Sequence, residues 1–293
     1  MSATAHRLWQ STAARAWAWS RPRIDRLVYT HGGLGDELLL TAVVNAARNQ
    51  GRPLHVLTER PEVWRHNSDP ASVQTGVDRW FYAQRRKWIR TRIDHLAYDH
   101  HRTEHIAVQM AAKAGVTLPD GWTPVFPIAP VPQARQRRTL VLHTSCRGAR
   151  YAAETKEWPF ARWQELAAQL APEFRLIQLG TPDDPVLHEA IDRRGATSLV
   201  EAARCLAEAG AFVGLESGLM HLAAATGTPA VILYGGRTLP SQTGYPQHLH
   251  LRTPTPCTPC GLDRGCPHGL SCLAVSPDEV VGHLRRLTLE ASP

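Results

Sequence analysis

The stretch that decides the fold is residues 24–59, IDRLVYTHGGLGDELLLTAVVNAARNQGRPLHVLTE. IDRLVYT has the short apolar pattern of a strand, HGGLG is a glycine loop, and DELLLTAVVNAARNQG places apolar residues at helical spacing before Gly51. PLHVLTE then has the pattern of a second strand. Strand, glycine turn, helix and strand make a βαβ unit with parallel strands and a right-handed crossover. The sequence therefore predicts a Rossmann-like domain here.

The same alternation starts again further along the chain. The strand patterns are TLVLHTS, FRLIQLG, AFVGLE and AVILYGG, and between them lie the helix patterns WPFARWQELAAQLA, LVEAARCLAEAG and SGLMHLAAATG. Short apolar strands that alternate with helices are typical of an open parallel sheet covered on both faces. We therefore expect an α/β protein with two Rossmann-like domains.

A proline-rich stretch marks the boundary between the two domains. Residues 119–138 contain five prolines and end in a basic run, as an extended linker does. We divide the chain into a basic, Trp-rich N-terminal segment (1–23), an N-terminal Rossmann-like domain (24–132), a C-terminal Rossmann-like domain (133–275) with a Cys-rich loop (257–272), and a C-terminal helix (276–293).

Three smaller elements are also predicted. VDRWFYA, at residues 77–83, has a strand pattern. Residues 103–115 form a helix candidate with Thr103 as its cap and Gly115 at its end. The last helix is expected to begin with Ser276 as its cap and Pro277 at its first position.

Composition indicates a globular protein with an anionic partner. Of the 293 residues, 43% are hydrophobic and 20% charged, which argues against a disordered chain. Lys and Arg total 33 against 26 Asp and Glu, a formal net charge of +7 that favours nucleotide phosphates, nucleic acid or an acidic membrane surface. Because no run approaches the roughly 20 apolar residues of a membrane span, we expect a cytoplasmic protein.

The N-terminal segment leaves a membrane contact open. Residues 1–23 carry Leu8, Trp9, Trp17 and Trp19 among arginines and contain no acidic residue. Tryptophan and arginine suit the headgroup region, so peripheral contact with the inner membrane is one interpretation. Packing of the segment on its own domain, or a frayed tail, is the other.

The glycine loop carries the first candidate catalytic residue. Gly33 and Gly35 lie where a strand turns into a helix, so a ligand can approach the backbone closely. The spacing is neither that of a dinucleotide fingerprint nor that of a P-loop. Asp36 stands at the helix start, where it either caps the helix or acts as a general base at the carboxyl edge of the sheet.

Two segments of the second half could hold a diphosphate. Glu216 ends a strand, Ser217 and Gly218 begin a helix whose free amides suit a phosphate, and His221 follows one turn later, as a ligand contact or as a structural histidine. Upstream, hydroxyls and cations follow another strand, where they can neutralise a diphosphate or form a solvated basic loop: Thr144, Ser145, Arg147, Arg150 and Lys156.

These three segments, in this order, resemble glycosyltransferase family 9, the heptosyltransferase family of bacterial lipopolysaccharide synthesis. The resemblance rests on the Gly-Gly-Leu-Gly-Asp loop at residues 32–36, Lys-Glu-Trp-Pro at 156–159, and the block from Glu216 to Pro229. It covers nearly the whole chain from Asp25 to Leu287. Glu216 stands where the family usually has aspartate, which leaves the donor sugar open, and the loop at 146–155 is longer than in the lipopolysaccharide enzymes.

The resemblance implies a GT-B architecture and inverting transfer of a sugar, heptose from ADP-heptose in the best-known members. By position, Asp36 becomes the base that activates the acceptor hydroxyl, and Lys156 stabilises the departing diphosphate. The donor-binding residues implied are Gly33, Gly35, Thr144, Ser145, Glu216, Ser217, Gly218 and His221. The N-terminal domain then binds the acceptor and the C-terminal domain the nucleotide sugar. Because Asp183 and Asp184 lie in a proline-flanked turn and form no DxD-like metal motif, we expect catalysis without a metal or other cofactor.

Four of the six cysteines crowd into one loop. Cys257, Cys260, Cys266 and Cys272 can close around one tetrahedral zinc or iron ion, with His268 as a substitute ligand. Reduced thiols used only for packing are the alternative. Similar Cys-rich tails occur in autotransporter heptosyltransferases of the resembled family, which implies a structural iron-binding finger.

Two other function classes remain open. A basic nucleic-acid-binding protein with a four-cysteine metal knuckle would also explain the net charge, but the basic residues are dispersed, so we expect no nucleic-acid partner. A sugar-nucleotide-binding protein without catalysis is the second alternative. The acceptor, a cell-envelope glycan such as lipopolysaccharide core or a protein hydroxyl, is expected to meet residues 84–105, which are dense in Arg and His.

Overall fold

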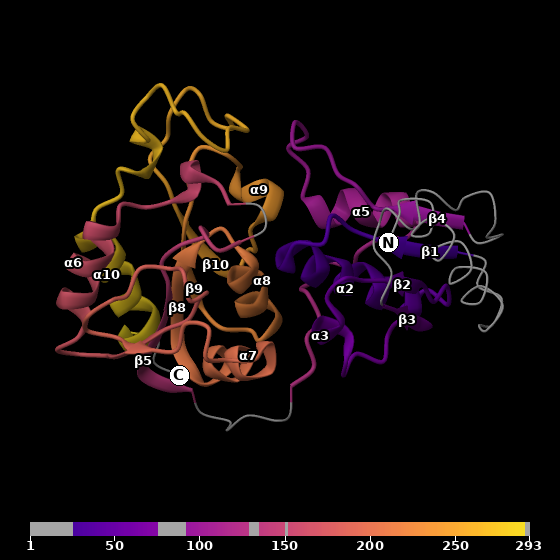
Figure 1. The fold of residues 1–293 in the computed structure, drawn as a ribbon, viewed down its shortest axis with the longest axis horizontal. Coiled ribbons are helices and arrows are strands. Elements are labelled where there is room, and N and C mark those ends of the chain that lie inside the picture. Colours follow the sequence, from indigo (N-terminus) through magenta and orange to yellow (C-terminus); the bar gives the residue numbers. More distant parts are fainter. Residues whose placement is uncertain (1–25, 76–91, 129–134, 150–151, 291–293) are drawn as a thin grey trace, which may run out of the picture.

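The structure of the protein is a computed structural model. It consists of two α/β domains that lie side by side (Figure 1). The structure describes residues 26–75, 92–128, 135–149 and 152–290. The basic segment 1–23 and the strand predicted at 77–83 lie outside the described residues.

The first domain is built on a parallel sheet of four strands in the order β3-β2-β1-β4. Its elements are β1 (Arg26–Tyr29), α2 (Leu34–Asn49), β2 (His55–Leu57), α3 (Pro61–Trp64), β3 (Ser72–Gln74), β4 (Arg92–His95) and α5 (Ile106–Ala114). The predicted strand, glycine loop, helix and strand are all present. Leu27 of the central strand pairs with His55 on one side and Ile93 on the other, so β1 is covered along both edges.

One helix start in this domain was predicted wrongly. The helix expected to be capped by Thr103 begins at Ile106, and its cap is His105, whose Nδ1 accepts the N–H of Ala107 at 3.1 Å. The amide of Gln109 donates to the carbonyl oxygen of Glu104 at 3.0 Å, which holds the preceding residues in a loop. Gly115 ends the helix in the left-handed conformation, with φ 77°, as the sequence predicts.

The second domain has six parallel strands in the order β10-β9-β8-β5-β6-β7. Its strands are β5 (Gln136–His143), β6 (Arg175–Gln178), β7 (Ile191–Asp192), β8 (Ala209–Leu215), β9 (Ala230–Leu233) and β10 (His248–Leu251). Its helices are η1 (Glu154–Lys156), α6 (Phe160–Leu170), α7 (Leu199–Glu208), α8 (Gly218–Ala225), α9 (Pro240–Thr243), η2 (Ser271–Leu273), α10 (Pro277–Arg285) and η3 (Arg286–Glu290). The two parallel sheets confirm the predicted α/β class with two Rossmann-like domains.

The two domains share a packed interface between α2 and α8 (Figure 1). Two glycines allow the close approach: a Cβ on Gly35 would lie 2.8 Å from the His221 ring, and one on Gly218 would lie 2.9 Å from the Leu34 side chain. The side-chain amide of Gln242 in α9 donates to the carbonyl oxygens of His100 and Arg102, at 2.7 and 2.8 Å. Apolar contact and hydrogen bonds thus both fix the relative position of the two sheets.

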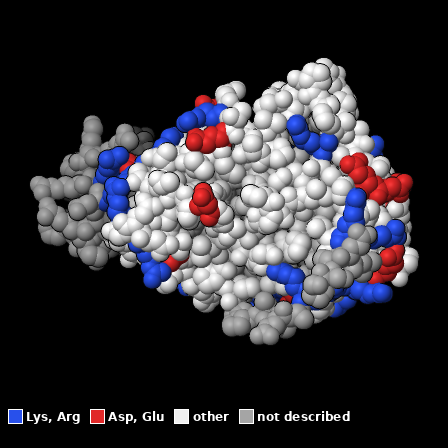
Figure 2. All heavy atoms as spheres, turned by 180° about the vertical axis from the view of Figure 1, so that it is seen from behind, with Lys and Arg blue, Asp and Glu red and all other residues white. Residues whose placement is uncertain are grey.

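On the one face that Figure 2 shows, charged side chains are sparse. On the face shown in Figure 2, Lys and Arg form small separate groups near the rim, several of them beside Asp or Glu, and the broad middle is almost uncharged. None of the helices in the described part of the chain is long and apolar enough to cross a bilayer.

Candidate active site

Asp36 lies in the first turn of α2, directly after the glycine loop. Its side chain is half-buried and is held from two sides: the Gly33 backbone N–H donates to Oδ2 at 3.3 Å, and the Tyr98 hydroxyl donates to Oδ1 at 2.7 Å. The first bond is part of the helix cap. An ionised carboxylate has about four positions at which it can accept a hydrogen bond, and these two bonds use two of them. A further donor group can therefore still approach Asp36 and pass a proton to it.

Lys156 and Glu216 form a buried ion pair in the second domain. Lys156 ends η1, and Glu216 follows β8 at the carboxyl edge of the sheet. Lys156 Nζ contacts Glu216 Oε2 and also donates to the Glu216 carbonyl oxygen at 3.4 Å. Burial opposes ionisation of Glu216, but the charge and hydrogen bond of Lys156 hold its pKa below the usual value. The lysine is therefore fixed as a cation at this edge.

Asp36 and the Lys156–Glu216 pair both act on Tyr98 and His100, which lie at the domain boundary. Burial raises the pKa of the Tyr98 hydroxyl, and the carboxylates of both Asp36 and Glu216 raise it further. Burial also lowers the pKa of His100, and the charges of Arg237 and Lys156 add to that effect. Charges from both domains shift the pKa values of Tyr98 and His100. The carboxylate of the first domain and the cations of the second therefore lie near the same two side chains.

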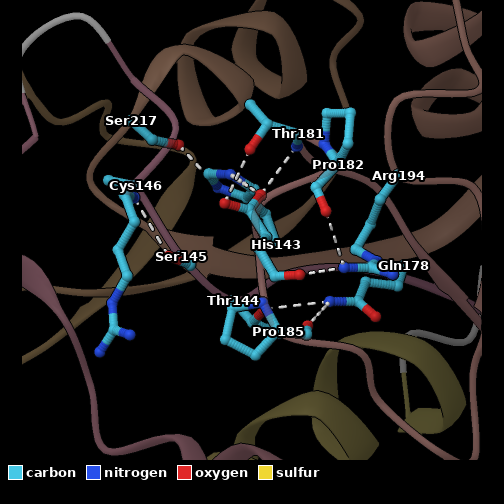
Figure 3. Close-up of polar contacts among 12 residues, drawn as sticks. His143, Thr144, Ser145, Cys146, Gln178, Thr181, Pro182, Pro185, Arg194 and Ser217 are labelled. Atoms are coloured by element: carbon cyan, nitrogen blue, oxygen red, sulfur yellow. Dashed lines mark hydrogen bonds and ion pairs between the residues drawn. The ribbon is translucent and has the colours of Figure 1, made fainter.

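The structure gives Thr144 and Ser145 partners inside the protein. Both are buried at the end of β5. The Thr144 hydroxyl accepts a hydrogen bond from the amide of Gln178 at 3.1 Å (Figure 3), and the Ser145 hydroxyl accepts from the Arg147 N–H at 3.1 Å. Ser145 also hydrogen-bonds to Glu157. Their predicted contact with phosphate stays a prediction, because in this conformation both hydroxyls support the loop around them.

His221 and Ser217 are each tied to a neighbouring ring. His221 is buried in α8, and its Nδ1 lies 2.6 Å from the Tyr245 hydroxyl. Burial lowers the pKa of His221 to about 3, so the ring is neutral at pH 7. Ser217 Oγ lies 3.1 Å from Nδ1 of His143 (Figure 3). Of the two alternatives that the sequence left for His221, the structure supplies the structural contact.

The three predicted donor-binding glycines surround the start of α2 and α8. Gly33 caps α2, whereas the space beside Gly35 and Gly218 is filled by His221 and Leu34 of the opposite domain. The structure therefore gives Gly35 and Gly218 a role in domain packing, and their contact with a donor stays a prediction.

Sequence reasoning missed two residues of this site. Tyr98 follows β4 in the Arg- and His-rich region that the sequence left unassigned, and only the folded chain brings it to Asp36. Arg237 follows β9 and is half-buried, with Nε 2.6 Å from Asp263 Oδ1. Its position after the paired glycines Gly235 and Gly236 is the one local signal for it.

The site can therefore hold an anion and accept a proton from a neighbouring group.

Comparison with known proteins shows which family the second domain is similar to. Residues 132–261, which carry Lys156 and the block from Glu216 to His221, match the model of glycosyltransferase family 9 (heptosyltransferase). This part of the chain belongs to glycosyltransferase family 9. Lipopolysaccharide heptosyltransferase 1 of Pseudomonas aeruginosa is 34% identical over 128 residues, which are 39% of this chain and 35% of that protein. The match thus spans about a third of the relative's length.

Solved structures extend the likeness to most of the chain at the level of the fold. Escherichia coli ADP-heptose lipopolysaccharide heptosyltransferase II has a TM-score of 0.66 at 17% identity, with 91% of this chain and 99% of that chain covered. The iron-containing heptosyltransferase TibC, from enterotoxigenic E. coli and in complex with ADP-D-β-D-heptose, has a TM-score of 0.69 at 17% identity, with 92% and 78% covered. The architecture is GT-B, as the resemblance implies.

The Cys-rich loop of the family 9 domain rests against the candidate site. All six cysteines are free thiols. The Cys260 N–H donates to the Gly236 carbonyl oxygen at 2.7 Å, and the Gly236 N–H donates to Cys272 Sγ at 3.1 Å. Among the described residues, no three His, Cys, Asp or Glu side chains are placed to hold one metal ion. The four cysteines are thus in one loop but do not form the predicted ligand set in this conformation.

Proposed function

We propose that this chain is an inverting, metal-independent glycosyltransferase that moves heptose from ADP-heptose to a hydroxyl of a bacterial cell-envelope glycan or protein. The observation that carries the proposal is the confrontation of Asp36 in the first domain with Lys156, Glu216 and Arg237 in the second, because the charges of both sides act on Tyr98 and His100. The relatives' names and the ADP-heptose complex of TibC support the donor.

Asp36 acts as the general base. It takes the proton of the acceptor hydroxyl as that oxygen attacks the anomeric carbon, and the bond from that carbon to the diphosphate oxygen breaks with its electron pair. A single displacement inverts the anomeric configuration. The Tyr98 hydroxyl, 2.7 Å from Oδ1, orients the carboxylate so that Oδ2 can face the acceptor.

Lys156 stabilises the negative charge that develops on ADP. The two protein cations beside the departing diphosphate, Lys156 and Arg237, can supply this stabilisation, which supports catalysis without a metal ion. Glu216 holds Lys156 at the end of β8. We propose that Glu216 also contacts the donor sugar, as its place in the block from Glu216 to Pro229 implies.

The turnover assay measures ADP release from ADP-heptose in the presence of a cell-envelope glycan fraction. We expect Lys156→Ala to lower kcat/KM by about 100-fold or more, since removal of one charge-stabilising group typically costs this much. Lys113→Ala, an exposed lysine of α5, is the matched control and should leave kcat/KM unchanged. An unaltered kcat/KM in Lys156→Ala would contradict the role of Lys156.

Calorimetric binding measurements, together with the turnover assay, distinguish the two alternatives from the proposal. A nucleic-acid binder would bind a short oligonucleotide and not ADP, and the dispersed charge in Figure 2 speaks against it. A binding protein without catalysis would bind ADP-heptose and release no ADP. The acceptor is identified by mass spectrometry of the glycan and protein fractions after the reaction.

We also propose a structural metal, zinc or iron, for the Cys-rich loop. The spacing of four free cysteines and the iron in the similar structure TibC support it, and Cys260 and Cys266 both act on the pKa of Cys272, which burial raises. The side chains must shift to form the set, because no three donors are in place among the described residues. A mercurial titration should release about one metal ion per chain; a fully folded, metal-free protein from cells would contradict this.

We also propose that the protein is cytoplasmic, and the free thiols of its cysteines support this compartment.

A further inference from the structure

A serine, a histidine and an aspartate lie in a row beside the proposed donor site, and the histidine and the aspartate are buried. Ser217 Oγ, directly before α8, is 3.1 Å from Nδ1 of His143 at the end of β5 (Figure 3). The other ring nitrogen, Nε2, is 4.0 Å from Oδ2 of Asp184 in the loop after β6. His143 and Asp184 are both buried, whereas Ser217 is half-buried.

The fold holds Asp184 against the His143 ring. The Thr181 N–H donates to Asp184 Oδ2 at 2.8 Å, and the Thr181 hydroxyl donates to Oδ1 at 3.0 Å. Gly180 has a φ of 153°, and a Cβ at that position would lie 2.2 Å from Oδ2, so only glycine leaves room for the carboxylate. Among the other charged groups of this corner, Lys156, Glu157 and Glu216 act on the neighbouring Cys146. Arg194, which follows β7, donates to the Asp184 carbonyl oxygen.

The proton state of His143 decides which way the Ser217 hydroxyl points. A neutral ring has one N–H, and the Asp184 carboxylate attracts it to Nε2, so Nδ1 must accept the Ser217 hydroxyl proton. Ser217 then presents only oxygen lone pairs to a ligand. A charged ring has a second N–H at Nδ1, which donates to Ser217 Oγ and frees the hydroxyl proton to donate to a phosphate oxygen.

We propose that His143 is a positioning residue that takes up a proton when the donor diphosphate binds and thereby turns the Ser217 hydroxyl toward a phosphate oxygen. The inference rests on the proposed function, since it concerns the diphosphate of that donor. Two effects act in the same direction: an imidazolium beside a diphosphate is electrostatically favoured, and the freed hydroxyl gives the anion a hydrogen bond. In the bound state the Asp184 carboxylate stabilises the positive charge of the His143 ring.

Burial lowers the pKa of His143, and Asp184 only partly opposes this, so before binding the ring is neutral at pH 7. Proton uptake on binding therefore links affinity to pH. The dissociation constant of the donor should rise with pH, by up to about tenfold per pH unit where the bound protein holds one more proton than the free protein.

The test is calorimetry of ADP-heptose binding, without acceptor, between pH 5 and pH 8 in buffers of different ionisation enthalpy. The diphosphate of ADP-heptose is a diester and does not titrate in this range, so protons taken up belong to the protein. We expect uptake of up to one proton per wild-type chain. His143→Asn, whose amide donates permanently from the position of Nδ1, should bind ADP-heptose without uptake and with a dissociation constant independent of pH.

His188→Asn, an exposed histidine on the same loop as Asp184, is the control and should keep the wild-type uptake. Wild-type binding with no proton uptake and a constant dissociation constant would overturn the inference alone, as would unchanged uptake in folded His143→Asn. If wild type fails to bind ADP-heptose at every pH, the proposed function falls and this inference falls with it. The wild-type measurement decides the matter even if His143→Asn does not fold.

Discussion

At the residue scale, Glu37 is a buried carboxyl beside the proposed base. It follows Asp36 in α2, is 1% exposed, and accepts the Trp64 indole N–H at 2.8 Å. Burial raises the pKa of Glu37 from 4.5 to about 7, although the bonds to Trp64 and Thr58 oppose this. The folded protein therefore holds this proton more tightly than the unfolded chain, so the contribution to stability is complete below pH 4.5 and is lost as the pH rises to about 7.

That loss corresponds to about 3 kcal/mol of unfolding free energy. Glu37→Gln keeps an acceptor for the Trp64 N–H and carries no charge, so we expect it to unfold at higher denaturant concentration than wild type at pH 8 and at nearly the same concentration at pH 4. Urea unfolding at both pH values measures this, with the exposed Glu165→Gln as control. Equal midpoints for Glu37→Gln and wild type at pH 8 would show that Glu37 ionises without cost.

At the element scale, the Cys-rich loop, residues 257–272, braces the segments that carry the two cations. The Asp263 carbonyl oxygen accepts the Glu154 N–H at 2.8 Å, next to Lys156, and the Asp263 carboxylate holds Arg237 at 2.6 Å. The Gly261 N–H donates to the Arg237 carbonyl oxygen at 3.2 Å. The loop thus positions Arg237 and the backbone before Lys156, with or without a bound metal.

We therefore expect Asp263→Ala to lower kcat while the free energy of unfolding hardly changes. Because Asp263 is exposed, its ion pair with Arg237 contributes up to about 1 kcal/mol, and the unfolding midpoint should hardly move. In contrast, kcat should fall several-fold as Arg237 loses its orientation. If Asp263 acts through Arg237, the double variant with Arg237→Ala should be no slower than Arg237→Ala alone. Fully additive losses in kcat would show that the two act independently; Asp120→Ala is the surface control.

At the scale of the whole molecule, long apolar patterns were predictable and tertiary contacts were not. The sequence predicts α2, β5 and α8, because apolar residues recur over many positions there, whereas β3, β4, β7 and β10 are two to four residues long and partly polar. Asp36 and Lys156 were found through local motifs. Tyr98 comes to Asp36 only through folding, and the hydrogen bond from Gln178 to the Thr144 hydroxyl likewise joins residues that are distant in the sequence.

The arrangement of the two domains leads us to expect that a base from the first domain and a donor site in the second act on one substrate. Asp36→Asn tests it most directly, with ADP-heptose affinity measured by calorimetry and transfer measured by ADP release. We predict affinity within about twofold of wild type, because the charged groups proposed to bind the diphosphate lie in the other domain, and transfer lowered by about 100-fold or more. Transfer at the wild-type rate, or loss of donor binding together with transfer, would contradict the assignment of Asp36 as the base.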